Sequence, residues 1–215
     1  MPNLVDITYN QTGQSTVEND MGMRDMQSRA YELRESKHLL LKSPPASGKS
    51  RALMFIALDK LANQGIKKVI VAVPERSIGG SFASTDLKSF GFFEDWVVKD
   101  EYNLCTPGGE KSKVKTFHNF LNSTERILIC THHTLRFAFD EIESESSFDN
   151  ILLAIDEFHH VSADISNKLG ELLRPIMNHS TAHILAMTGS YFRGDSIPIL
   201  LAEDEDKFTK MSYNY

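Results

Sequence analysis

Five short runs of almost uninterrupted apolar residues constrain the fold of this chain more than any other feature. Each run has four or five residues, and none alternates apolar and polar residues as a strand with one face in water does. Strands of this kind are buried on both faces, which is typical of a parallel sheet covered by helices. The five predicted strands are 38–41, 69–73, 127–130, 151–155 and 183–187.

Segments with helical periodicity lie between these strands, and two polar stretches, 104–113 and 143–149, are predicted surface loops. The repeated alternation predicts an α/β fold, a doubly wound and mostly parallel sheet with helices on both faces. Ligands of such folds bind at the carboxyl ends of the strands, so residues that directly follow a strand are the candidates for a site. The predicted helices are 21–35, 51–62, 113–121, 134–142 and 165–177.

The composition excludes several classes of protein. Of the 215 residues, 41% are hydrophobic and 24% are charged, close to the average of folded proteins in water. No apolar run approaches the roughly 20 residues of a membrane-spanning helix, so we expect no membrane partner. The two cysteines are too few for a disulfide scaffold and indicate a reducing, cytoplasmic location. With a net charge of −6, any contact with nucleic acid is confined to a few loops.

A predicted phosphate-binding loop lies between the first strand and the next helix. Its sequence fits G-x-x-x-x-G-K-[ST], except that Ser43 replaces the first glycine and Ala46 stands where glycine is frequent. Gly48 leaves space for a phosphate, Lys49 can place its ammonium on the β- and γ-phosphates, and Ser50 can offer a hydroxyl to Mg²⁺. The alternative is an ordinary helix N-terminus. The predicted cradle consists of Ser43, Pro44, Pro45, Ala46, Ser47, Gly48, Lys49 and Ser50.

Two acidic residues, Asp156 and Glu157, directly follow the predicted strand 151–155. Burying carboxylates costs free energy unless a cation balances them, and Mg²⁺ bound to ATP would supply that balance. In this interpretation Asp156 holds the metal through water, and Glu157 orients or deprotonates the attacking water. The alternative is a solvated acidic turn at the start of a helix, where acids suit the helix dipole.

These blocks resemble the first RecA-like domain of superfamily 2 helicases of the DEAD/DEAH-box kind, over roughly residues 21–195. The segment 43–50 matches motif I, and Asp156-Glu157-Phe158-His159 is a DExH form of motif II. Motif Ia is a poor match here, and motif III usually reads Ser-Ala-Thr. The remaining blocks are Pro74-Glu75-Arg76-Ser77 for motif Ia, Thr131-His132-His133-Thr134-Leu135 for the motif Ib region, and Thr188-Gly189-Ser190 for motif III.

The resemblance implies roles for residues outside the two main motifs, with ATP and Mg²⁺ as cofactors and a DNA or RNA backbone as partner. Gln27 would read the adenine edge, or else is an exposed helix residue. Thr188, Gly189 and Ser190 would couple the nucleotide to the strand-binding groove, with His159 as the catalytic-motif residue that contacts them. The residues implied to grip the strand are Pro74, Arg76, Ser77, Thr131 and Thr134.

Structural alternatives exist for several of these residues. Arg76 can be a surface residue, and Thr131 can cap a helix. The tandem histidines 132–133 and 159–160 and the neighbouring Cys130 lack the spacing of zinc ligands, and the two members of a tandem pair point in different directions.

The predicted domain organisation is a flexible arm over 1–20, a RecA-like ATP-binding domain over 21–202, and a tail over 203–215. The resemblance implies a second RecA-like domain beyond residue 215 that supplies an arginine finger, a large factor in turnover. We therefore expect a monomer that binds nucleotide and hydrolyses it weakly alone.

Two other functions stay open. A small-molecule kinase or phosphotransferase would need a basic lid over the phosphates, and few basic residues follow the acidic pair. A nucleotide-binding module without turnover is the other, because Ser43 and Ala46 depart from the phosphate-loop pattern. The basic residues after the acidic pair are Lys168, Arg174, Arg193, Lys207 and Lys210.

Overall fold

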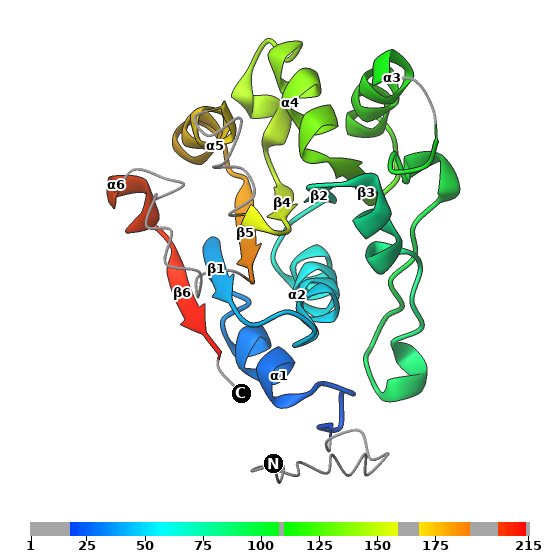
Figure 1. Ribbon diagram of the computed structural model, residues 1–215, viewed down its shortest axis with the longest axis vertical. Helices are drawn as coiled ribbons and strands as arrows, with labels where there is room; N and C mark the ends of the chain where they lie inside the picture. Colours follow the sequence, from blue (N-terminus) through cyan, green and yellow to red (C-terminus); the bar gives the residue numbers. More distant parts are fainter. Residues whose placement is uncertain (1–17, 108–109, 159–167, 190–201, 214–215) are drawn as a thin grey trace, which may run out of the picture.

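A computed structural model describes residues 18–107, 110–158, 168–189 and 202–213. Its centre is a six-stranded, all-parallel sheet in the order β3-β2-β4-β5-β1-β6, which confirms the predicted fold class (Figure 1). The strands are β1 (His38–Lys42), β2 (Lys68–Val73), β3 (Ile127–Thr131), β4 (Ile151–Ile155), β5 (His183–Thr188) and β6 (Thr209–Ser212).

Helices cover both faces of the sheet. Figure 1 shows α1 and α2 on one face and α3, α4 and α5 on the other. The α-helices are α1 (Asp25–Glu32), α2 (Lys49–Asn63), α3 (Glu110–Leu121), α4 (His132–Asp140), α5 (Lys168–His179) and α6 (Ala202–Glu205). Short 3₁₀ helices span Arg76–Phe82, Lys88–Phe90, Asp100–Tyr102 and Glu145–Phe148.

Alternation along each strand sends side chains into two separate cores. In β2, Val69, Val71 and Val73 join the core under α1 and α2, whereas Ile70 and Ala72 join the core under α3, α4 and α5. All five of these side chains have no exposed surface. This two-sided burial is the physical reason for the apolar runs in the sequence.

The sixth strand corrects one expectation. Residues 209–212 fall in the segment predicted as a tail, yet they pair in parallel with β1, Leu39 opposite Thr209 and Lys42 opposite Ser212. Only Met211 of this edge strand is buried, so no apolar run marks it in the sequence. The predicted arm falls mainly on residues 1–17, outside the described part of the chain.

Helix boundaries differ from the sequence expectations by a few residues. The first helix begins only at Asp25, because its N-cap Arg24 has an extended backbone with ψ of 164° and follows a turn in which Gly22 has a φ of 72°. The helix α3 begins at Glu110, inside the stretch predicted as a loop over 104–113. Among the described residues, no helix is both long and apolar enough to cross a bilayer.

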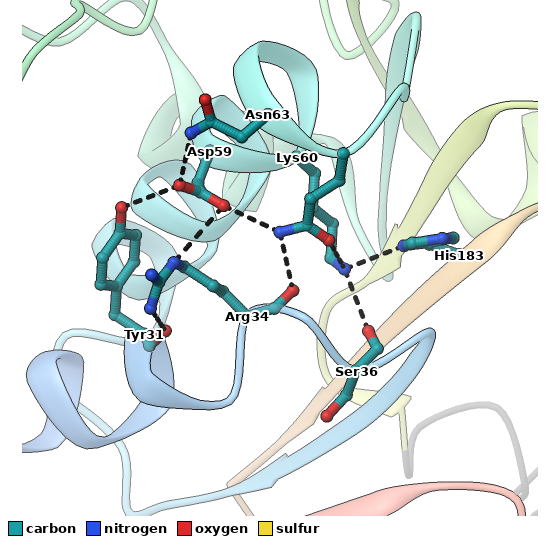
Figure 2. Close-up of polar contacts among 8 residues, drawn as sticks. Tyr31, Arg34, Ser36, Asp59, Lys60, Asn63 and His183 are labelled. Carbon is teal, nitrogen blue, oxygen red and sulfur yellow. Dashed lines mark hydrogen bonds and ion pairs between the residues drawn. The ribbon is translucent and has the colours of Figure 1, made fainter.

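A partly buried polar cluster around Asp59 fixes α1 against the C-terminal half of α2 (Figure 2). The Asp59 carboxylate accepts hydrogen bonds from Tyr31 Oη (3.1 Å), Asn63 Nδ2 (2.8 Å) and Gln64 Nε2 (2.8 Å). Arg34 Nε adds an ion pair to Asp59 at 3.4 Å. Burial alone would raise the pKa of Asp59, but these donors together hold it below its usual value.

The next residue on α2, Lys60, extends this cluster to the sheet (Figure 2). Its ammonium donates to Ser36 O at 3.0 Å, Gln64 Oε1 at 3.1 Å and His183 Nδ1 at 2.9 Å. These three bonds use all three of its protons. Burial lowers the pKa of Lys60 to about 8, and burial next to Lys60 lowers the pKa of His183 to about 4.

The contact between Lys60 and His183 predicts a pH-dependent contribution to stability. The folded pKa of His183 lies below its unfolded value of 6.5, so its contribution is complete above pH 6.5 and is lost as the pH falls towards 4. His183→Asn keeps an acceptor for Lys60 but does not titrate. We expect it to remove up to roughly 3 kcal/mol of the loss in unfolding free energy that acid causes. The melting temperature should then fall less between pH 6.5 and pH 4.

The control is the exposed histidine of α4, changed as His133→Asn, which should leave that slope unchanged. His38 also has a pKa lowered to about 4 by burial and by Lys37, Lys207 and Lys60, so part of the slope remains in either variant. Equal slopes in His183→Asn and the unmodified protein would contradict the prediction.

Candidate active site

Two loops meet at the carboxyl edge of the sheet, one after β1 and one after β4, with the end of β5 between them. The backbone N–H of Ser43 donates to Thr188 O at 3.1 Å. The backbone N–H of Gly189 donates to Glu157 Oε2 at 3.2 Å. The end of β5 is therefore hydrogen-bonded to both the predicted phosphate loop and the predicted acidic corner.

The phosphate loop has the backbone turn that a cradle needs. Gly48 precedes α2 with a positive φ of 93°, and a Cβ at this position would lie 2.5 Å from Gln27 Nε2. Ala46 also has a positive φ, 61°, a conformation that costs a residue with a Cβ roughly 1–2 kcal/mol. Ser43 and Ser47 are buried, and their Oγ atoms lie 2.7 Å apart, so the serine that replaces the first glycine is bonded within the loop.

Lys49 is buried at the head of α2, with 7% of its surface exposed. Its Nζ donates to the carbonyls of Ser43 and Pro44, both at 3.1 Å, and lies 4.0 Å from Glu157 Oε1. A Cβ added at Gly189 would lie 3.3 Å from Lys49 Nζ and 3.4 Å from Glu157 Oε1. The ammonium therefore faces the acidic corner, and glycine at 189 leaves the space between them open.

The acids of this corner differ in environment. Asp156 is 5% exposed, and burial together with the nearby Glu157 raises its pKa to about 6, against the opposing effect of Lys49. Glu157 has a positive φ of 47°, a strained conformation that costs on the order of 1–2 kcal/mol. The strained turn lets Glu157 bond the Gly189 N–H and approach Lys49.

The donor set of this corner fits a magnesium ion. Carboxylate and hydroxyl oxygens are ligands that Mg²⁺ accepts, and a divalent cation would offset the cost of ionising the buried Asp156. Asp156 directly follows β4, and Ser50 lies in the first turn of α2. Among the described residues, no group of three or more histidines, cysteines and acids could hold a metal by itself.

Gln27 lies against the phosphate loop, although 21 residues separate it from Gly48. It is 2% exposed, its Nε2 donates to Gly48 O at 3.3 Å, and its Oε1 accepts from the Arg24 N–H at 2.9 Å. The alternative of an exposed helix glutamine is therefore wrong.

The residues predicted to grip a strand fall into two groups. Arg76 and Ser77 are exposed in the 3₁₀ helix after β2, and Pro74 is half-buried. Thr131 instead caps α4, because its Oγ1 accepts from the Thr134 N–H at 3.1 Å. Thr134 has no exposed surface, so the described conformation shows the capping alternative for Thr131 and offers no phosphate contact through Thr134.

Some site predictions stay outside the described structure, and one neighbour of the acids was not predicted. His159 and Ser190 lie outside the described residues, so the structure does not place them. His132, the first residue of α4, has its Nε2 3.0 Å from Asp156 O. Two sequence signals could have drawn attention to it, the tandem histidines and the position of His132 in the block compared with motif Ib.

A phosphate loop that faces an acidic pair at the carboxyl edge of a parallel sheet defines a P-loop nucleotide-binding domain. The sequence model of the DEAD/DEAH box helicases matches residues 24–194, and the chain belongs to this family. It is a helicase-type ATP-binding domain.

The chain is similar in sequence to part of a longer protein. The chain is 66% identical, over all its 215 residues, to a Bacillus subtilis (strain 168) protein named "Putative ATP-dependent helicase YeeB". It spans only 36% of the length of that relative.

Solved helicase structures share the fold at low identity. The Hef helicase domain of Pyrococcus furiosus superposes with a TM-score of 0.59 at 16% identity, covering 90% of this chain and 38% of that chain. The DUF1998 helicase MrfA, bound to DNA and AMPPNP, gives 0.60 at 14% identity, covering 90% and 27%. The UvsW helicase of bacteriophage T4 gives 0.54 at 15% identity, covering 87% and 60%.

Proposed function

We propose that the chain is the Mg²⁺·ATP-binding motor domain of a DExH-type nucleic-acid helicase or translocase. The observation that carries this proposal is the approach of Lys49 Nζ to Glu157 Oε1, 4.0 Å, across the gap that Gly189 leaves open. A lysine on the phosphates opposite an acid on the attacking water is the arrangement that phosphoryl transfer to water needs.

Each residue of the corner then has a part in the reaction. Lys49 and the loop N–H groups would bind the phosphates, and a bound Mg²⁺ ion would supply positive charge beside them. Asp156 and Ser50 would hold the metal. Glu157 would orient or deprotonate the water, and its bond to the Gly189 N–H fixes the carboxylate for that task.

The nucleic-acid contact and the need for a second domain are parts of the same proposal. The exposed Arg76 and Ser77 can bind backbone phosphates without reading bases. A structural neighbour, MrfA, is described as bound to DNA and AMPPNP, and the longer relative leaves room for a second RecA-like domain. We propose that efficient hydrolysis requires that domain, because an arginine finger contributes a large factor.

The proposal is tested by titrating the chain with a fluorescent ATP analogue in Mg²⁺, with pyrophosphate as competitor. Gln27→Ala should weaken ATP about tenfold and pyrophosphate by much less, because ATP loses a base contact in addition to the support that the bond from Gln27 Nε2 to Gly48 O gives the loop. Arg29→Ala, on the exposed face of the same helix, is the control and should behave like the unmodified chain. Failure of the unmodified chain to bind the analogue would overturn the proposed function, and equal loss for both ligands would remove Gln27 from the site.

A further inference from the structure

We infer that His132 is a positioning residue that holds the backbone of the acidic corner in the shape required for metal binding. The inference rests on the proposed function of that corner. The hydrogen bond between His132 and the acidic corner is to the backbone rather than to a carboxylate. His132 acts through Asp156, whose carbonyl oxygen lies 3.0 Å from His132 Nε2. Because a carbonyl oxygen can only accept, Nε2 carries the proton of this hydrogen bond.

The contact bridges strands that are not neighbours. His132 begins α4 directly after β3, and β2 lies between β3 and β4 in the sheet. The imidazole therefore reaches past the carboxyl end of β2 to the residue that follows β4. The start of α4 is itself fixed, since Thr131 caps the helix through the Thr134 N–H at 3.1 Å. A side chain on a capped helix start is a stable anchor for the corner.

The hydrogen bond constrains the backbone on both sides of the metal-binding candidate. The Asp156 N–H donates to Ala72 O at 2.9 Å, and its C=O accepts from His132. Both peptide groups that flank the Asp156 Cα are therefore held. The second of these peptides leads into Glu157, whose φ is +47°. A residue other than glycine keeps a left-handed backbone conformation only where neighbouring contacts stabilise it, and the hydrogen bond from His132 is one of those contacts.

This arrangement gives the tandem histidines different tasks. His132 points to the Asp156 carbonyl, whereas His133 is exposed, with its ring centroid 4.5 Å from that of Phe137. The pair supplies its own matched control, because the two residues are adjacent, chemically identical and at the start of the same helix. The hydrogen bond from His132 Nε2 to Asp156 O also links the motif Ib region directly to motif II.

The test separates the hydrogen bond from the volume of the ring. His132→Gln places an amide donor near the position of Nε2, and His132→Met fills a similar volume without a donor. Each variant, His133→Ala and the unmodified chain are titrated with Mg²⁺ at fixed fluorescent ATP analogue, and with the analogue in EDTA. Circular dichroism melting of each protein monitors the fold.

We expect His132→Met to raise the apparent Kd for Mg²⁺ about tenfold. This is the size typical of losing a hydrogen bond to a residue that binds the metal. Metal-free affinity for the analogue should change less than twofold, since the phosphate loop is untouched. His132→Gln should restore most of the Mg²⁺ affinity, and His133→Ala should leave it unchanged.

Other outcomes overturn the inference in distinguishable ways. Normal Mg²⁺ affinity in His132→Met, with binding intact in the unmodified chain, would remove His132 while leaving the proposed function standing. Equal loss with and without Mg²⁺, or equal loss in His133→Ala, would show a general structural effect and also overturn it. If the unmodified chain binds no analogue in Mg²⁺, the proposed function and this inference both fail.

Discussion

Lys49→Ala is expected to reduce the affinity of the chain for ATP about 100-fold, equivalent to about 2.7 kcal/mol. Lys49 is 7% exposed and its ammonium is already ordered by two carbonyls of the loop, so little further ordering is needed when phosphates bind. A charge-assisted contact in such a buried place is worth more than one at the surface. Isothermal titration calorimetry with ATP and Mg²⁺ measures the change.

The chain offers a matched control for this variant in Lys60. Both lysines are buried on α2, Lys49 at its head and Lys60 eleven residues later, and both donate to backbone carbonyls. Lys60→Ala removes the donor to Ser36 O and His183 Nδ1, far along the helix from the phosphate loop. It should lower the melting temperature and leave ATP affinity within twofold. Loss of ATP binding in both variants alike would show that Lys49 acts only through stability.

The sheet could be predicted from the sequence because five of its strands are buried on both faces. Their side chains alternate between two apolar cores, so almost every position in a run had to be apolar. The edge strand β6 lacks this property, because three of its four residues are exposed. Its place beside β1 depends on backbone pairing, which leaves no mark on the residue types.

The two main motifs could be predicted because each begins directly after a strand, the phosphate loop after β1 and the acidic pair after β4. Their meeting at one edge follows from parallel topology, and the 4.0 Å approach of Lys49 to Glu157 is the outcome. His132 could not be placed in the same way. Its partner Asp156 is 24 residues away and follows β4, a strand that is not adjacent to β3, and the order of the strands cannot be read from the sequence.

Two buried aspartates, Asp59 and Asp156, lie in contrasting environments. Both are 5% exposed, but their pKa values shift in opposite directions. Asp59 has donors on both carboxylate oxygens within the fold, which outweigh the effect of burial (Figure 2). For Asp156, burial and Glu157 prevail over Lys49, and the pKa rises to about 6. A buried acid whose ionised form the fold opposes is typical of a functional site.

Asp156→Asn is therefore expected to stabilise the fold and to abolish the effect of Mg²⁺ on ATP affinity. At pH 7.5 the carboxylate is ionised, and its burial opposes folding, so we expect the variant to be about 1–2 kcal/mol more stable. The raised pKa makes this cost complete above about pH 6, and it disappears as the pH falls below 3.8. The gain should therefore shrink as the pH falls below about 6 and vanish only below pH 3.8, while Mg²⁺ should no longer tighten ATP binding at pH 7.5. Urea unfolding across this pH range and ATP titrations with and without Mg²⁺ measure the two effects.

Asp59→Asn is the opposite control, because its carboxylate is stabilised by Tyr31, Gln64 and Arg34. It should lose roughly 1–3 kcal/mol at pH 7.5 and retain the effect of Mg²⁺ on ATP affinity. Its lowered pKa means that the loss fades as the pH falls below 3.8. Destabilisation of both variants at pH 7.5 would mean that Asp156 is held by contacts of the fold, as Asp59 is. The case for a metal at the end of β4 would then fail, since the carboxylate would need no cation to balance it.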